Sequence, residues 1–264
     1  MKERLLRLLE RAGVLRRAYG LYELAKAFTP GRPQPRMAAD GLPVPPRRLI
    51  VRVAGTASTE WFLEGGRLGA ETIREVLARQ GRPVEELGAM LDFGCGCGRV
   101  TRYWAALDGT DVRGTDASTD AVEWCRRNLA FARFETNGLA PPLPFGDAGF
   151  ELVYALSVFT HLTEELGLAW AAELDRVLRP GGLLLVTTHG ERYRPRLSAS
   201  ERERFDAGEL VVRRAEAAGS NLCAAFHPRA YVQETLAGQL EAVEFVPEGA
   251  KGNPYQDLHL LRKR

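Results

Sequence analysis

The sequence has little cysteine and no long apolar run, and each absence excludes a class of protein. It contains four cysteines, Cys95, Cys97, Cys125 and Cys223. Their spacing shows no paired framework, which excludes a disulfide-built miniprotein and is typical of a reducing compartment. The longest apolar runs, such as residues 152–156, fall far below the roughly 20 residues that a membrane-spanning helix needs. Because lysine and arginine recur through the first segment, no secretory signal is predicted, and we expect a cytoplasmic protein.

Proline and glycine are too sparse for a fibrous or low-complexity chain, at 15 and 27 of 264 residues. The composition, 45% hydrophobic and 27% charged, is that of a globular protein of one or two domains. Charge is distributed unevenly. Residues 1–48 hold 11 Lys and Arg against 4 Asp and Glu, whereas the rest of the chain holds 25 against 30. A net-negative main domain is a poor partner for bulk nucleic acid, so a nucleic-acid substrate is not expected.

The N-terminal segment carries most of the excess positive charge. Over residues 2–28, apolar side chains such as Leu8, Ala12 and Leu15 recur at spacings of three and four, which predicts a basic amphipathic helix. Such a helix could pack on its own domain, contact a second copy of the chain in a homodimer, or bind a partner or membrane surface. Six prolines in residues 29–48 predict an extended linker or surface wrap.

The remainder, residues 49–264, is predicted to be one domain of the α/β class. A helix is expected over residues 58–80, broken by Gly65, Gly66 and Gly69. Short apolar runs then alternate with helical segments, which implies a parallel sheet with helices on both faces. The predicted strands are 89–93, 111–115, 133–136, 150–156 and 183–188, with late strands at 240–245 and 258–261. The predicted helices are 99–107, 119–130, 164–178 and 228–236.

A glycine-rich loop follows the first predicted strand. Gly94, Gly96 and Gly98 occupy alternate positions, so the backbone can turn sharply and a ligand can lie against bare main chain. Amide donors at the start of the helix predicted next would suit an anionic or carboxylate group. Cys95 and Cys97 lie inside this loop and lack a second cysteine pair, so no metal site is expected.

Two aspartates indicate which ligand this loop serves. Asp116 ends the second predicted strand, 22 residues after Gly94, where a carboxylate can accept both hydrogen bonds of a ribose diol. These features suit either a dinucleotide or an adenosyl cofactor. Asp92 lies just before the first glycine, where its charge would repel a pyrophosphate but suit the cationic methionine end of S-adenosylmethionine.

At this point the chain resembles a class I S-adenosylmethionine-dependent methyltransferase. The glycine loop resembles the first motif of that superfamily, and the Gly-Thr-Asp-Ala-Ser run at residues 114–118 resembles its second. Residues 142–155 resemble the approach to its fourth strand, and residues 178–186 resemble the turn into its fifth. The resemblance is strong over about residues 88–190 and leaves residues 1–48 outside.

The resemblance implies a Rossmann-like sheet of seven strands, mostly parallel, with the last strand antiparallel. It places ribose at Asp116, adenine near Asn137 and Gly138, and the methionine moiety near Leu156 and Ser157. Arg67 could pair with the methionine carboxylate or remain solvated. The cofactor-binding residues expected on this basis are Asp92, Gly94, Cys95, Gly96, Gly98, Asp116, Ala117, Asn137, Gly138, Leu156 and Arg67.

The predicted reaction is methyl transfer to a small-molecule or sugar hydroxyl. A hydroxyl acceptor must lose its proton, and histidine suits that task near neutral pH. His161 and His189 follow the fourth and fifth predicted strands, and His227 lies in the tail, so these three are the candidate bases; His259 is expected to be structural. Residues 191–227 are interpreted as a lid or specificity insert.

Three alternatives remain open from the sequence. The chain could methylate RNA, DNA or protein, although no Asn-Pro-Pro-Tyr run follows the fourth predicted strand. It could be a non-catalytic nucleotide-binding module of the same fold. An NAD-dependent oxidoreductase is the third. Residues 1–28 precede the linker, so we expect them to be dispensable for cofactor binding.

Overall fold

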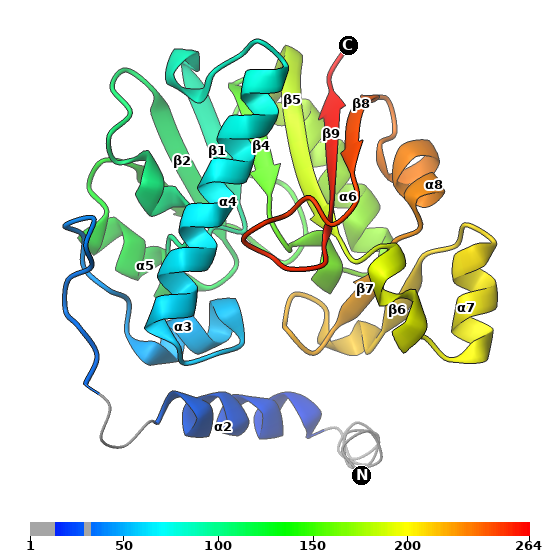
Figure 1. The fold of residues 1–264 in the computed structure, drawn as a ribbon, viewed down its shortest axis with the longest axis horizontal. Coiled ribbons are helices and arrows are strands. Elements are labelled where there is room, and N and C mark those ends of the chain that lie inside the picture. Colours follow the sequence, from blue (N-terminus) through cyan, green and yellow to red (C-terminus); the bar gives the residue numbers. More distant parts are fainter. Residues whose placement is uncertain (1–13, 29–32) are drawn as a thin grey trace.

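The computed structural model describes residues 14–28 and 33–264, and its centre is one seven-stranded sheet (Figure 1). The strands lie in the order β3-β2-β1-β4-β5-β9-β8. All neighbouring pairs from β3 to β5 are parallel, whereas β9 is antiparallel to both β5 and β8. The predicted Rossmann-like, mostly parallel sheet is therefore confirmed. Its strands are β1 (Ala89–Phe93), β2 (Asp111–Asp116), β3 (Arg133–Thr136), β4 (Phe150–Ala155), β5 (Leu178–Thr188), β8 (Glu241–Val246) and β9 (Asp257–Arg262).

Helices and short turns surround this sheet. Several begin at a capping side chain: Ser58 accepts from the amide of Trp61 before α4, and Thr163 accepts from Leu166 before α6. The helices are α2 (Leu15–Ala27), α3 (Arg47–Ala54), α4 (Thr59–Arg79), α5 (Thr119–Asn128), α6 (Glu164–Val177), α7 (Ala199–Asp206) and α8 (Arg229–Tyr231). The 3₁₀ turns are η1 (Val84–Glu86), η2 (Thr101–Trp104), η3 (Phe159–His161), η4 (Glu191–Arg196) and η5 (Ala215–Ala217), and a π-helical turn η6 (Val232–Leu236) follows α8.

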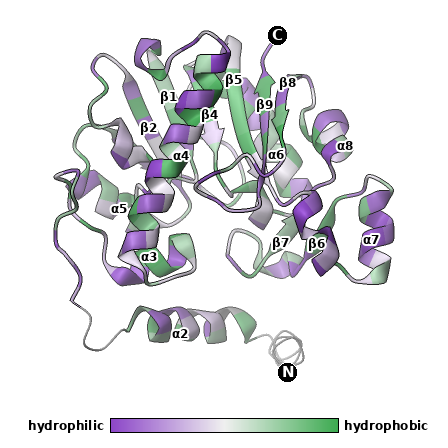
Figure 2. Ribbon diagram, in the orientation of Figure 1, coloured by the Kyte–Doolittle hydropathy of each residue, from purple (hydrophilic) through white to green (hydrophobic). Residues whose placement is uncertain are grey.

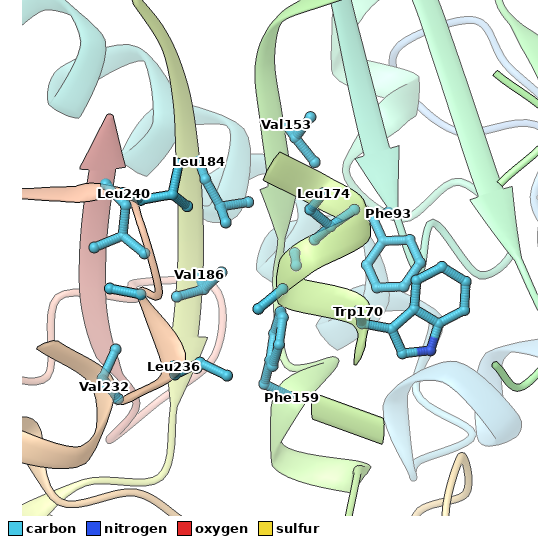
Figure 3. Packing of buried hydrophobic residues seen from close by; sticks show 14 of the residues in the cluster. Phe93, Val153, Phe159, Trp170, Leu174, Leu184, Val186, Val232, Leu236 and Leu240 are labelled. Atoms are coloured by element: carbon cyan, nitrogen blue, oxygen red, sulfur yellow. The ribbon is translucent and has the colours of Figure 1, made fainter. Parts of the chain in front are cut away.

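Alternate residues of the strands face two different layers of helices. Met90 and Leu152 point into a core built with α4 and η2. Leu91 and Val153, one residue further along, belong to the core on the other face with α6, α8 and η6. There the ring of Phe93 lies 4.6 Å from that of Trp170 (Figure 3). Figure 2 shows β5 in the hydrophobic colour, as expected for a strand that is buried on both faces. The outlying α7 is mostly in the hydrophilic colour.

Helix α4 does not break at its glycines, contrary to the prediction. Gly65, Gly66 and Gly69 are all buried within one continuous helix. A Cβ at position 66 would overlap the main-chain carbonyl of Arg99, and one at position 69 would lie 3.1 Å from the side chain of Val100. These glycines therefore allow close packing against the loop after β1, and tertiary contact outweighs their poor helix propensity.

The helix predicted over residues 99–107 is also wrong in type. The chain forms only the 3₁₀ turn η2, in which the amide of Tyr103 bonds the carbonyl of Val100. The Arg102 side chain is buried and makes two hydrogen bonds to Asp40, at 2.6 and 2.9 Å. That ion pair fastens η2 to the proline-rich segment, which wraps the domain.

The regions at the two ends of the predicted core hold elements that the sequence did not indicate. Helix α3 begins directly after Pro46. Within residues 191–227, α7 is followed by a small antiparallel pair, β6 (Val211–Arg213) and β7 (Ala224–Phe226). The predicted N-terminal helix is present as α2, while residues 2–13 of that prediction lie outside the described residues. Over the part of the chain that the structure describes, no helix has the length and apolarity to cross a membrane.

Candidate active site

A cavity of about 1460 Å³ lies where β1, β2 and β4 end. The strand order reverses between β1 and β4, and ligands of open α/β sheets bind in the crevice beside such a reversal. A drug-sized ligand occupies a site of roughly 300–1000 Å³, so this cavity is larger than a site for one such ligand needs to be. Its walls come from segments far apart in the sequence, including α2, α3, the glycine loop and residues 214–222.

The glycine loop forms one wall of the cavity. Gly94, Gly96 and Gly98 all have positive φ angles, of 78°, 54° and 73°, a conformation that other residues rarely adopt. Gly94, Cys95 and Gly96 line the cavity. Gly98, predicted to contact the cofactor, is not part of the cavity lining, and a Cβ at its position would overlap the side chain of Leu129.

Asp116 is held at the end of β2 by two backbone amides. Its Oδ2 accepts from Gly96 at 2.8 Å, and its Oδ1 accepts from Ser118 at 2.7 Å. Burial raises the pKa of this carboxyl, and the two amide bonds partly offset that effect. Each oxygen keeps a second lone pair for a ligand, and Ala117, the next residue, also lines the cavity.

Asp92 and Arg99 are two buried charged groups that line the same cavity. They are only 4% and 7% exposed. Asp92 accepts from the Thr101 hydroxyl at 2.5 Å, while Arg99 donates to Gly252 O at 3.0 Å and to Asn253 Oδ1 at 2.5 Å. Burial raises the pKa of Asp92 to about 6. A carboxylate and a guanidinium on one wall suit a zwitterion, because each can bind the opposite charge of an amino acid.

Arg67, which the sequence offered either as a partner of the methionine carboxylate or as a solvated residue, lies outside the cavity lining, whereas Arg99 is part of it. Arg67 lies on the exposed side of α4, where Glu64 and Glu71 neutralise it. Arg99 directly follows the glycine loop, and its ring neighbour Trp61 lies 5.7 Å from the guanidinium. The position of Arg99 directly after the glycine loop was the signal in the sequence that could have indicated it, but only the fold shows that its side chain is buried at the cavity.

Asn137 carries a buried polar atom that lacks a partner. Its Nδ2 donates to Gly138 O at 2.7 Å, whereas its Oδ1 is buried and has no hydrogen-bond partner among the described residues. Both residues line the cavity beyond Asp116. A buried acceptor without a donor is costly, and an exocyclic amine such as that of adenine would satisfy it. The residues present therefore fit an adenosyl group.

His161 has a fixed tautomer at the cavity wall. It lies in η3, just after β4, and its Nδ1 is 2.8 Å from the carbonyl oxygen of Cys223. Because a carbonyl only accepts, Nδ1 carries the proton and Nε2 is left with its lone pair. Burial lowers the pKa of His161, although the bond to Cys223 opposes the shift. A neutral imidazole with a free Nε2 has the form that a general base requires.

The other two candidate histidines lie outside the cavity lining. The His189 ring is sandwiched against Tyr193 and Phe226, at 4.1 and 5.6 Å between centroids. His227 is 3% exposed and packs near Tyr231. Burial lowers the pKa of each of these histidines to about 3. His227 is buried after β7, and His189, half-buried after β5, stacks on Tyr193, so neither ring is part of the cavity lining.

A hydrogen-bonded network joins Ser157, just after β4, to Gln256, just before β9. Gln256 donates to Ser157 Oγ at 2.8 Å and accepts from Thr187 at 2.8 Å. Ser157 has a φ of 63°, an uncommon value for a residue with a side chain that is often found at functional sites. Leu156, Ser157 and Gln256 all line the cavity. Contacts between β4 and the segment before β9 cannot be read from either segment alone.

Helix α2 closes the cavity from outside the sheet. Leu15 is buried against Ala217 and Leu222, and Tyr19 is close enough to Asn221 for a hydrogen bond. Asn221 in turn donates to the carbonyl of Arg52 on α3 at 2.7 Å. Because α2 lines the cavity, the expectation that this segment is dispensable for cofactor binding loses its structural basis.

Known proteins are similar to this chain over the segment that holds the glycine loop. Residues 91–186 match the family described as a methyltransferase domain. An uncharacterized methyltransferase from Synechocystis is 37% identical over 101 residues, which are 38% of this chain and 47% of that protein. A fatty-acid O-methyltransferase from Mycolicibacterium smegmatis is 35% identical over 106 residues, or 39% of this chain and 38% of that protein. The chain thus spans less than half the length of these curated relatives.

Solved structures agree on the fold. The CcbJ methyltransferase from Streptomyces caelestis aligns with a TM-score of 0.53 at 16% identity, covering 75% of this chain and 89% of that one. Within residues 14–28 and 33–264, no cluster of three or more His, Cys, Asp or Glu could hold a metal ion. The sheet order and the glycine loop after β1 are those of the class I S-adenosylmethionine-dependent methyltransferase fold, and residues 91–186 of this chain form its methyltransferase domain.

Proposed function

We propose that this chain transfers a methyl group from S-adenosylmethionine to an oxygen atom of a small-molecule acceptor. One observation carries the proposal: the cavity that holds the orphaned acceptor of Asn137 and the carboxylate of Asp116 is also lined by His161. In this arrangement Asn137 binds adenine, Asp116 binds the ribose diol, and Asp92 and Arg99 bind the methionine ammonium and carboxylate.

The chain's own residues supply positioning and a proton acceptor. When bound, S-adenosylmethionine supplies an electrophilic methyl group. Alignment of the two reactants in a closed cavity provides a large share of the rate in such a displacement. His161 Nε2 takes the proton of the acceptor hydroxyl, directly or through one water, while Cys223 O holds the ring in the tautomer that allows this. Ser157 and Gln256 are placed to orient the acceptor.

An oxygen acceptor has two kinds of support. The relative from Mycolicibacterium smegmatis is named an O-methyltransferase, and a neutral histidine suits the deprotonation of a hydroxyl near neutral pH. We extend this to a small-molecule or sugar hydroxyl because much of the cavity wall beyond the cofactor residues is apolar, with Leu162, Trp170 and Leu222 among its residues.

The proposal is tested by binding and then by turnover. Calorimetry should show binding of S-adenosylhomocysteine and no response to NADH. With radiolabelled S-adenosylmethionine and a panel of hydroxyl and carboxyl compounds, the parent should label an oxygen acceptor. His161→Gln should keep cofactor affinity and lose about 100- to 10,000-fold in rate, the usual contribution of a general base.

A matched control separates the base from general damage to the histidine-rich region. His259→Asn alters another buried histidine, which bonds Thr188 inside the sheet, and should keep its rate in the fraction that remains folded. Turnover of His161→Gln at the parental rate would remove His161 from the mechanism. Tight NADH binding without any response to S-adenosylhomocysteine would overturn the proposed function itself.

A further inference from the structure

Helix α2 presents apolar side chains on two sides, and only one side is used by the fold. On the inner side, Leu15 is 4% exposed and packs against the 214–222 segment. On the outer side, four large apolar residues remain exposed. Their exposed fractions are 38% for Val14, 69% for Leu21, 59% for Leu24 and 77% for Phe28.

The four exposed residues form one continuous stripe. They follow one another at spacings of seven, three and four. Leu21 and Leu24 lie on one face of α2, and Val14 and Phe28 are the residues that flank the helix at its two ends. Figure 1 shows α2 lying along the outside of the molecule beside α3, to which it is joined by the bond from Lys26 to Gly55 O. An exposed apolar stripe of this kind is typical of a surface that associates with a partner or a membrane.

Charge indicates which surface this stripe meets. Arg17 lies three residues after Val14 and four before Leu21, and its side chain is exposed on the same face. Residues 1–48 carry seven more basic than acidic residues, while the rest of the chain carries five more acidic than basic ones. Each Lys or Arg near an anionic bilayer adds about 1 kcal/mol of attraction. A second copy seated stripe to stripe would instead bring basic segments together.

We propose that the outer face of α2, defined by Val14, Leu21, Leu24 and Phe28, docks on an anionic lipid surface. The apolar side chains enter the headgroup boundary and Arg17 meets lipid phosphates, as in amphipathic interfacial helices. Because the inner face of α2 lines the cavity, docking sets the cavity beside the bilayer, where amphiphilic acceptors are concentrated. That last step rests on the proposed function, whereas the docking itself does not.

The test is vesicle co-sedimentation with the full chain. The parent should pellet with vesicles of equal parts phosphatidylcholine and phosphatidylglycerol, should bind phosphatidylcholine alone weakly, and should be released by salt. The triple variant Leu21→Ser, Leu24→Ser, Phe28→Ser should lose at least about tenfold in partitioning. Leu168→Ser removes a leucine of similar kind, 36% exposed on α6, and should bind as the parent does.

Three results would overturn the proposal. They are absence of parental binding to anionic vesicles, equal binding by the triple variant, and a parental dimer in light scattering that the triple variant converts to monomer. The last result would identify a second copy as the occupant of the stripe. Calorimetry with S-adenosylhomocysteine on the same proteins keeps the two proposals apart, because the outer stripe faces away from the cavity and cofactor affinity should survive in the triple variant.

Discussion

At the scale of single residues, burial decides what identical side chains do. Arg67 is neutralised at the surface of α4 by Glu64 and Glu71, whereas Arg99, which directly follows the glycine loop, is buried at the cavity. The Arg99 guanidinium interacts electrostatically with the buried carboxyl of Asp92, and a charge in such a low-dielectric site attracts an anion strongly because it is poorly screened. The sequence alone cannot distinguish these two arginines.

This difference gives a paired prediction. Arg99→Gln should weaken binding of S-adenosylhomocysteine by about 1.5–3 kcal/mol, the range for a hydrogen bond to a charged group, and Arg67→Gln should leave it unchanged. Methylthioadenosine lacks the amino-acid end, so its affinity should fall little in either variant. Calorimetry with both ligands measures the effect. An equal loss for the two ligands in Arg99→Gln would mean that Arg99 only supports the Gly252–Asn253 loop.

At the scale of elements, the strands of the seven-stranded sheet were predictable, whereas several helices and the small β6–β7 pair were not. Strands β1 and β3 match their predicted ranges, because parallel strands buried on both faces appear as apolar runs between turns. Helix α4 was misjudged since glycine propensity is local, whereas its glycines serve contacts with residues more than thirty positions away. Helix α3 was missed because its apolar residues follow a proline cluster that indicates only extended chain.

The packing of α4 predicts opposite effects for two glycine-to-alanine changes. Gly66→Ala should destabilise the protein by about 1–3 kcal/mol or more, because the new methyl group would overlap the rigid carbonyl of Arg99. Gly20→Ala, in α2, has no atom within 4 Å of the new Cβ and should be neutral or slightly stabilising by helix propensity. Urea denaturation monitored by circular dichroism measures both. Equal stability of the two variants would contradict this account of the helix.

At the scale of the whole molecule, the wall of the cavity at the strand ends could be predicted and the closure of the cavity could not. Gly94, Asp116 and Asn137 each follow or end a parallel strand. Because the carboxyl ends of these strands lie at one edge of the sheet, the three residues line the same cavity. Helix α2 and the 214–222 segment reach the cavity through tertiary contacts such as the packing of Leu15 on Leu222 and the hydrogen bond from Asn221 to the carbonyl of Arg52. No local pattern records that contact, so the N-terminal helix was placed outside the site.

The interior of the molecule also holds three histidines that make its stability depend on pH. Burial lowers the pKa of His189 and His227 to about 3 and that of His259 to about 4. The unfolded chain binds a proton on each near pH 6.5, whereas the folded protein does not, so stability falls as pH drops below that value. Asp92 acts in the opposite direction, because its pKa is raised to about 6 and protonation relieves a buried charge.

Comparison of the parent with a His227 variant isolates the contribution of His227 to the pH dependence of the unfolding free energy. From about pH 7.5 to about pH 5, His227 alone should cost the parent about 2 kcal/mol of unfolding free energy. His227→Gln keeps a side-chain amide near the carbonyl of Ala225, to which the ring bonds, but cannot take up the proton. It should therefore start less stable and lose about 2 kcal/mol less than the parent over the same interval, measured by urea midpoints at the two pH values. Parallel losses in parent and variant would show that His227 is hydrated or already protonated in the folded state, which its 3% exposure argues against.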